Sequence, residues 1–254
     1  MNIGIALSGG GARGIAHVGV LKALDEMGVK VSCMSGTSAG SIVGTLYAYG
    51  YSPDEIFDII KEVTVFRSVR PAWAWAGLLT MDGLRELLLS AMPENDFNAL
   101  KMPMFVVATD IRKGEPHYFS KGELIPAIIS SCSVPAVFNP VNYNGGLFVD
   151  GGLCDNLPSK VIRDSCDLLI GSHCNPISNN FDARSLKVVI ERSLLMAING
   201  NTQMSKTICD IIIEPKKLDQ FSSFEIAKAK EIFNIGYEFT VKNFKVDNFK
   251  KVTA

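Results

Sequence analysis

A serine stands at the centre of a five-residue pattern that can carry nucleophilic chemistry. Residues 36–40 read GTSAG, which fits GxSxG, and they fall between an apolar run and a helical pattern. A sharp strand-to-helix turn of this kind strains the serine backbone and projects its hydroxyl above the sheet. Gly36 and Gly40 supply the small neighbours that the turn requires. The alternative is a small-residue turn in which Ser38 only caps the helix.

A serine hydroxyl needs a base to take its proton, and Asp150 is the favoured candidate. It closes the strand pattern GLFVD and is followed by Gly151 and Gly152, which allow another backbone to approach closely. In a parallel sheet, a carboxylate at a strand end lies on the same edge as the serine turn. Partial burial would raise its basicity. The alternative is an Asp-Gly turn in which Asp150 bonds its own backbone.

The three histidines are weaker candidates for this base. His17 falls on the predicted first helix, and His117 falls beside a predicted hairpin. Only His173 follows Asp150 in the chain order serine, acid, histidine that hydrolase triads of this kind use. Order alone does not bring groups together, so His173 stays open as an alternative base.

A glycine cluster, GGGARG at 9–14, follows the first apolar run. As GxGxxG (Gly9, Gly11, Gly14) it matches a dinucleotide-binding pattern, but that pattern also needs an acidic residue at the end of the second strand. The second strand runs into GTS instead. Alternatively, the unhindered amides at a helix N-terminus can hold a developing anion, with Arg13 adding positive charge.

These groups are positioned by alternating strand and helix patterns, which predict an α/β sandwich with a mostly parallel central sheet. A single domain is expected over residues 1–245, with a loose tail over 246–254. Strands are predicted over 2–7, 29–35, 104–111, 146–152, 167–173 and 207–215, with 117–120 pairing with 104–111. Helices are predicted over 15–28, 39–50, 123–133, 184–200 and 223–242, and another is predicted to open at Ser52-Pro53.

Composition excludes several classes of protein. The chain has 254 residues, 47% of them hydrophobic, which is ample for a folded core. Its 25 basic and 26 acidic residues give a net charge of −1, so bulk charge does not favour nucleic acid. Six cysteines without a CxxC pair indicate free thiols. Cys166, His173 and Cys174 lack a fourth zinc ligand.

Neither a membrane span nor a secretory signal is expected. No segment reaches the roughly 18–20 apolar residues that cross a bilayer. The N-terminus has no basic start and no sufficient hydrophobic stretch before its glycines. We therefore expect a cytoplasmic location.

Three motifs in this order resemble those of the patatin-like phospholipase family: GGGARG at 9–14, GTSAG at 36–40 and DGG at 150–152. The surrounding IALSGGGARGIAHVGVLKAL also looks like that family's opening. The resemblance covers nearly the whole chain and is strongest over 3–50 and 146–160. It implies a three-layer α/β/α sandwich and a lipid acyl hydrolase, acting on phospholipids or lysophospholipids as a serine esterase without a metal or other cofactor.

The resemblance also implies roles for single residues. Ser38 would be the nucleophile and Asp150 the general base of a Ser-Asp dyad without histidine. Lipid or acyl-ester substrates and transient contact with a membrane surface are the expected partners, and nucleic acid is not. The amides of Gly10 and Gly11 would be the main oxyanion donors. The predicted oxyanion hole comprises Gly9, Gly10, Gly11, Arg13 and Gly14.

An aromatic and basic stretch over 65–79 contains Trp73 and Trp75. It suits an acyl-pocket wall, a lid or an interfacial contact, or simply a loop packed on the core. Three alternative functions stay open at this point. They are a nucleotide-binding protein that uses GxGxxG, acyl transfer on the same dyad, and a non-catalytic interaction module.

Overall fold

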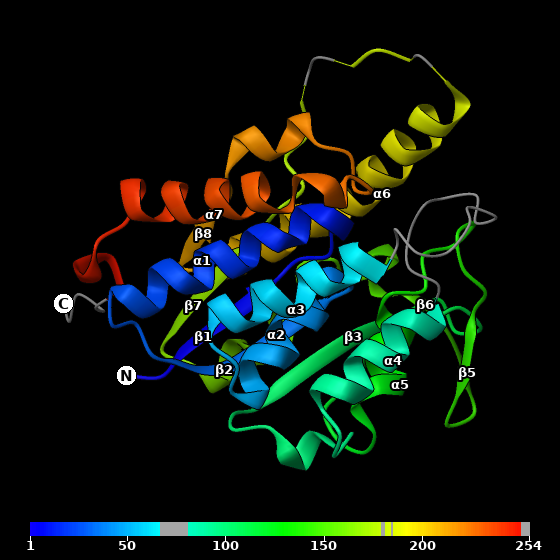
Figure 1. The fold of residues 1–254 in the computed structure, drawn as a ribbon, viewed down its shortest axis with the longest axis horizontal. Helices are drawn as coiled ribbons and strands as arrows, with labels where there is room; N and C mark the ends of the chain where they lie inside the picture. The colour runs from blue at the N-terminus through cyan, green and yellow to red at the C-terminus, as the bar shows by residue number, and fades with distance from the viewer. Residues whose placement is uncertain (67–80, 179–180, 184, 250–254) are drawn as a thin grey trace.

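The computed structural model of the chain describes residues 1–66, 81–178, 181–183 and 185–249 (Figure 1). At its centre is one sheet with the hydrogen-bonded order β5-β6-β3-β2-β1-β7-β8, and β4 also pairs with β3. The strands are β1 (Ile3–Leu7), β2 (Val31–Thr37), β3 (Met104–Asp110), β4 (Glu115–Phe119), β5 (Val141–Tyr143), β6 (Gly146–Asp150), β7 (Leu168–Ser172) and β8 (Ile211–Ile213).

The sheet is mostly parallel, as the alternating pattern predicted. Strands β3, β2, β1, β7 and β8 run parallel to one another. Strands β4, β6 and β5 are antiparallel to their neighbours and extend the sheet beyond β3. The hairpin predicted between 104–111 and 117–120 is present as β3 and β4. Strands β1 and β7 are fully buried, which is why they appear in the sequence as continuous apolar runs.

Helices cover both faces of this sheet and complete the three-layer α/β/α sandwich. The larger core lies between the sheet and a layer that includes α1, α2, α5 and α7 (Figure 1). The smaller core, with Ala6 and Leu169 at its centre, packs against the other face and reaches Ile208 at the end of α6. The helices are α1 (Ile15–Glu26), α2 (Ala39–Tyr49), α3 (Pro53–Phe66), α4 (Met81–Ala91), α5 (Leu124–Ser131), α6 (Leu186–Ile208) and α7 (Ala229–Asn243).

The chain differs from the expected pattern in several places, including 207–215 and the C-terminal segment. Helix α6 continues through 207–208, so only Ile211–Ile213 of the apolar run 207–215 pairs as a strand. The tail expected to be loose from residue 246 forms a short 3-10 helix over Val246–Phe249. The Phe249 side chain is buried there and its ring packs on Phe244. An apolar anchor thus ties this segment to the core.

None of the helices in the described part of the chain combines the length and the apolar character that a bilayer span needs.

Candidate active site

Ser38 occupies a strained turn between β2 and α2. Its backbone has φ 51° and ψ −122°, a conformation that residues other than glycine rarely adopt. Its amide donates to the Ser131 hydroxyl at 2.8 Å, which holds the turn in place. A Cβ at Gly40 would collide with the backbone carbonyl oxygens of Leu7 and Ser8, so only glycine fits there. Glycine therefore lets α2 begin directly against the end of β1.

Asp150 reaches the same turn from the opposite direction. Residues 106–110 of β3 pair with β4 along one edge. The other edge is shared by β2, which ends with Thr37 opposite Val107, and by β6, which ends with Asp150 opposite Ala108. Strands β2 and β6 therefore meet end to end on this edge. The expectation that Asp150 ends a strand parallel to β2 is wrong, because β6 is antiparallel, yet the antiparallel register brings the carboxylate to Ser38.

The glycine after Asp150 makes this junction tight. A Cβ at Gly151 would collide with the Val107 carbonyl oxygen and would crowd the Thr37 methyl group. The Gly152 amide donates to Oδ1 of Asp150 at 2.8 Å, and the Asp150 amide donates to the Ser133 carbonyl at 2.9 Å. The turn expected as the alternative role of Asp150 is thus also present, alongside its contact with Ser38.

The environment makes the Asp150 carboxylate a stronger base than an ordinary aspartate. Its side chain is buried, and burial raises its pKa to about 6. Hydrogen bonds from the Ser38 side chain and the Gly152 amide stabilise the charged form and oppose part of that rise. At neutral pH the carboxylate is still mostly ionised, so it can accept a proton from Ser38.

The glycine cluster lies beside the serine turn. A Cβ built on Gly9 would lie 3.3 Å from the Ser38 Cβ. The Gly9 amide is occupied, because it donates to the Asn156 carbonyl at 3.1 Å. Within the described ranges, the amides of Gly10 and Gly11 donate to no acceptor. Two free backbone donors near a nucleophile have the character of an oxyanion site.

The other two residues of the predicted oxyanion set have supporting positions. Gly14 packs closely on Ala39 and so brings α1 against α2. Arg13 is buried, and its Nε donates to the Phe221 carbonyl at 2.7 Å. Burial lowers the pKa of Arg13. The Ala12 amide donates to the Ser223 carbonyl at 2.8 Å, so two adjacent bonds tie the glycine loop to 221–223.

The three histidines contact other residues of the fold. His173 lies after β7, with β1 between it and β2, and its Nδ1 contacts Oε1 of Glu214 at 2.8 Å. His117 packs its ring against Phe119 and Phe148. Among contacts in the described part of the chain, no histidine touches Ser38 or Asp150.

His17 is buried as well. Its Nε2–H donates to the Ser8 carbonyl, and Nδ1 accepts from the Ser172 hydroxyl. Burial lowers its pKa to about 4, so the ring is neutral at physiological pH.

Sequence patterns missed two neighbours of the serine. Ser131 bridges the turn to β3, because its hydroxyl donates to the Val107 carbonyl while accepting from the Ser38 amide. The thiol of Cys132 lies beside Ser38 and Asp150, and burial raises its pKa. Both come from the small-residue end of α5, which carries no motif and whose pairing depends on the tertiary fold.

Other predicted features fall elsewhere. Trp73 and Trp75 lie outside the described residues, and so does most of 65–79.

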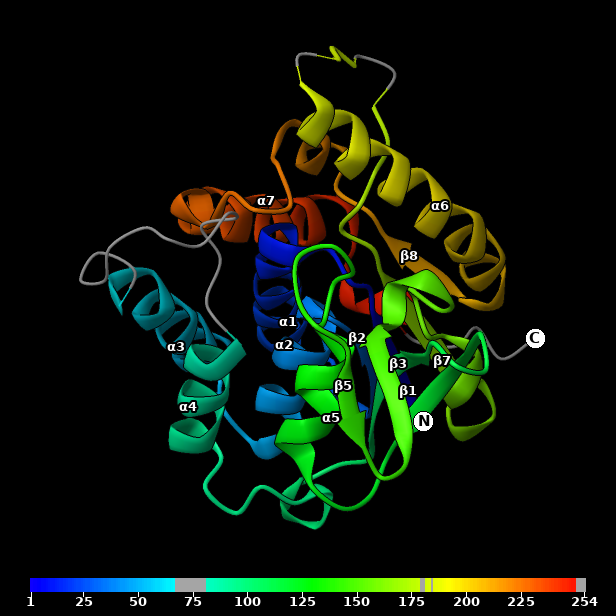
Figure 2. The same cartoon turned by 90° about the vertical axis from the view of Figure 1, so that its right-hand side faces the viewer.

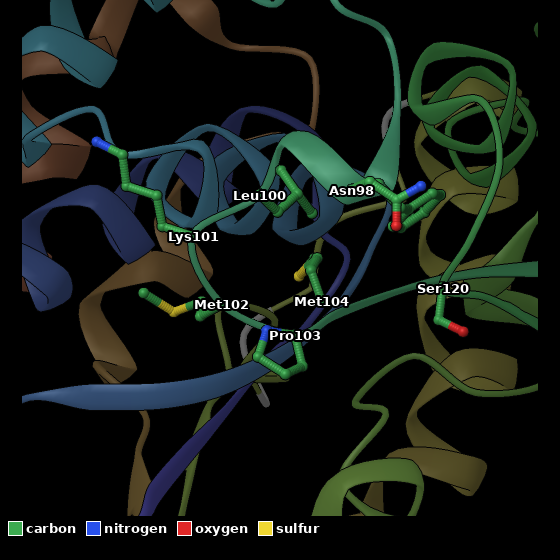
Figure 3. Close-up of a pocket in the computed structure, with 8 residues that line it drawn as sticks. Asn98, Leu100, Lys101, Met102, Pro103, Met104 and Ser120 are labelled. Atoms are coloured by element: carbon green, nitrogen blue, oxygen red, sulfur yellow. The ribbon is translucent and has the colours of Figure 1, made fainter.

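A pocket of about 320 Å³ opens near the start of β3, at the opposite end of that strand from the junction with β6 (Figure 3). Its lining includes Lys101, Pro103 and Ser120. Over the described residues, no three His, Cys, Asp or Glu side chains converge as a metal site.

The family model described as patatin-like phospholipase matches residues 5–161. An uncharacterised NTE family protein of Mycobacterium tuberculosis is 34% identical over 177 residues, covering 68% of this chain and 49% of that protein. Lysophospholipase nte1 of Aspergillus fumigatus is 26% identical and covers 93% of this chain but 18% of its own length. This chain thus spans about half the length of the mycobacterial relative, and far less of the fungal one.

The fold has a counterpart among solved structures. VipD from Legionella pneumophila superposes with a TM-score of 0.54, covering 95% of this chain and 66% of that one, at 16% sequence identity. At that identity the likeness concerns the fold alone.

Proposed function

This chain belongs to the patatin-like phospholipase family, and we propose that it hydrolyses acyl esters of lipids with Ser38 as nucleophile and Asp150 as general base. The observation that best supports the proposal is the end-to-end meeting of β2 and β6, which brings the buried Asp150 carboxylate next to the serine of a strained turn. A serine nucleophile requires a base close enough to take its proton, and this proximity supports that role for Asp150.

The reaction would begin with a proton transfer. Asp150 takes the proton of Ser38 as its oxygen attacks the acyl carbonyl, and the raised pKa of Asp150 favours this step over that of an ordinary aspartate. The new oxyanion would accept from the Gly10 and Gly11 amides. In other hydrolases one such donor is worth roughly 3–4 kcal/mol in the transition state.

Bond cleavage then proceeds in two halves. The alcohol leaves with the proton held by Asp150, and an acyl ester of Ser38 remains. Water gives its proton to Asp150 and attacks this ester. As the bond between the acyl group and the serine oxygen breaks, Asp150 returns that proton to Ser38, and the fatty acid is released. Acyl transfer to another alcohol would use the same residues, with that alcohol in place of water.

A lipid-panel assay with wild type and Ser38→Ala side by side tests the proposal. We expect release of fatty acid from lysophospholipid or phospholipid by wild type and loss of at least a thousandfold in Ser38→Ala, with an unchanged circular dichroism spectrum. Ser130→Ala is the matched control, since Ser130 is also a fully buried serine and its hydroxyl donates to the Pro126 carbonyl within α5. Esterase activity retained in Ser38→Ala contradicts the assignment.

A further inference from the structure

Helix α6 exposes large apolar residues in addition to those that it turns toward the protein, such as Ile198 and Ile208. Its water-exposed side carries a stripe of large apolar residues at helical spacing, which we call the outer face: Leu186, Val189, Ile190, Met196 and Met204. Leu186 and Met204 are each 75% exposed, and Ile190 and Met196 are more than half exposed. A surface helix ordinarily turns such residues toward the core.

The charged groups of α6 that the structure describes are engaged with neighbouring segments. Of its charged side chains that the structure describes, Glu191 accepts from the Ser223 amide, Arg192 donates to the Ser178 carbonyl and Lys206 donates to Glu214. The exposed side of α6 also carries uncharged polar residues. The Ser193 and Thr207 hydroxyls donate back to the Val189 and Met204 carbonyls, and the Gln203 amide donates to Asn199. None of the exposed α6 residues whose side chains the structure describes is therefore charged.

The same helix borders the candidate active site. Asn201 donates to the Gly152 carbonyl at 3.0 Å and accepts from the Asn156 amide. The Ile198 side chain lies next to Gly152, and Gly152 holds the Asp150 carboxylate. One side of α6 thus contacts the loop after Asp150 while the opposite side faces outward, along the edge of the molecule (Figure 2).

The size of the outer face separates two kinds of occupant. A helix of 23 residues is about 35 Å long and roughly 10 Å wide, so one face offers about 350 Å². A stable protein dimer needs about 800 Å² per partner. An uncharged helix face that is too small for a dimer still suits the headgroup–acyl boundary of a bilayer, where an amphipathic helix inserts its apolar side by about 5–10 Å.

We propose that the outer face of α6 docks on the surface of a lipid bilayer, with the helix lying in the membrane plane and the Asp150 loop beside it. The choice of a bilayer as occupant rests on the proposed function, because a lipid hydrolase must meet its substrate in an aggregate. The lack of charge on the face favours neutral lipid, so phosphatidylcholine vesicles are the appropriate probe.

The test compares two triple variants. Ile190→Gln/Met196→Gln/Met204→Gln makes the outer face polar with good helix formers. Leu89→Gln/Val241→Gln/Val246→Gln changes apolar residues that are also exposed but lie on α4, α7 and the C-terminal segment. Vesicle co-sedimentation measures binding, and turnover of a short, water-soluble ester reports the active site without a membrane.

We expect the outer-face variant to lose at least tenfold in partitioning to vesicles and in hydrolysis of vesicle lipid. The control variant should match wild type in both, and all three proteins should turn over the soluble ester within twofold. Equal vesicle binding by wild type and the outer-face variant overturns the proposal, as does a wild-type protein that does not bind vesicles.

A third result also overturns it. If light scattering shows a wild-type dimer that the outer-face substitutions convert to a monomer, the face is covered by a second copy of the chain. Failure of the proposed function would give a different result. Wild type would then not turn over the soluble ester, or Ser38→Ala would still turn it over, and neither outcome depends on vesicle binding.

Discussion

Ser38 and Asp150 meet because the strands that carry them run head-on along one edge of β3. Thr37 is opposite Val107 and Asp150 is opposite Ala108. Two consecutive residues of β3 therefore fix where Ser38 and Asp150 lie along the length of that strand. The Val107 carbonyl lies at the junction itself, where it accepts from Ser131 and contacts Gly151. The spacing between serine and carboxylate is thus fixed by backbone pairing.

The first prediction concerns Ser131. Ser131→Ala leaves the Ser38 amide and the Val107 carbonyl without their buried partner, which costs about 2–3 kcal/mol in the free energy of unfolding. Because the serine turn loosens, we expect Ser38 to react with a fluorophosphonate at least tenfold more slowly. Urea unfolding and labelling kinetics measure the two effects.

Ser130→Ala is its matched control. Ser130 is also fully buried, but its hydroxyl bonds only the Pro126 carbonyl one turn earlier in α5. We expect a loss of about 1 kcal/mol or less and wild-type labelling. Equal labelling rates in the two variants would show that Ser131 does not hold the turn.

The second prediction is the pH dependence of acylation. Because burial raises the pKa of Asp150 to about 6, the base is protonated below that pH and ionised above it. The fluorophosphonate labelling rate should rise about tenfold per pH unit up to pH 6 and then level off. Asp150→Asn should label slowly at every pH. A midpoint near pH 4 in wild type would mean that Asp150 behaves as an exposed carboxylate.

A third prediction uses the same group as a probe of stability. The folded pKa of Asp150 is raised, so the folded state holds the proton more tightly than the unfolded state, and ionisation destabilises the fold. Relative to Asp150→Asn, wild type should lose stability as the pH rises from about 4 to about 6, and the difference should stay constant above that. We expect Asp150→Asn to be more stable at pH 8 by on the order of 1–3 kcal/mol, and equal to wild type near pH 3.

Thermal unfolding of both proteins from pH 3 to pH 8 gives this curve. Asp164→Asn provides the control, because Asp164 is exposed, and it should change the free energy of unfolding by no more than about 0.5 kcal/mol at any pH. A wild type that is more stable than Asp150→Asn at pH 8 would contradict the proposed cost of the buried charge.

Much of the fold could be predicted from local patterns. Fully buried parallel strands such as Ile3–Leu7 and Leu168–Ser172 appear as unbroken apolar runs, and the turn glycines mark where they end. The limits of β8 were harder to predict, because the apolar run 207–215 continues the pattern of α6 and only three of its residues pair with β7. Tertiary pairing decides that boundary.

Local patterns likewise predict only part of the candidate site. Ser38 and the glycine loop could be predicted because strained turns and close backbone approaches demand particular residue types. The direction of β6 could not, since a strand's apolar pattern is the same whichever way it runs. The roles of Ser131 and of α6 at the site were missed for a related reason. These roles depend on contacts between distant segments, and such contacts leave no local signature.

The last prediction separates the strain at Ser38 from its chemistry. With φ 51° and ψ −122°, any residue with a Cβ is strained there, and such strain costs of order 1–3 kcal/mol. Glycine relieves the strain but adds about 0.5–1 kcal/mol of unfolded-state entropy. Ser38→Gly should therefore exceed Ser38→Ala in the free energy of unfolding by about 1 kcal/mol, while both lack esterase activity. At Ser130, inside α5, the order should reverse, because glycine is the poorer helix former by about 1 kcal/mol. Urea unfolding of the four variants decides the matter: if alanine is the more stable at both positions, the turn at Ser38 is not strained.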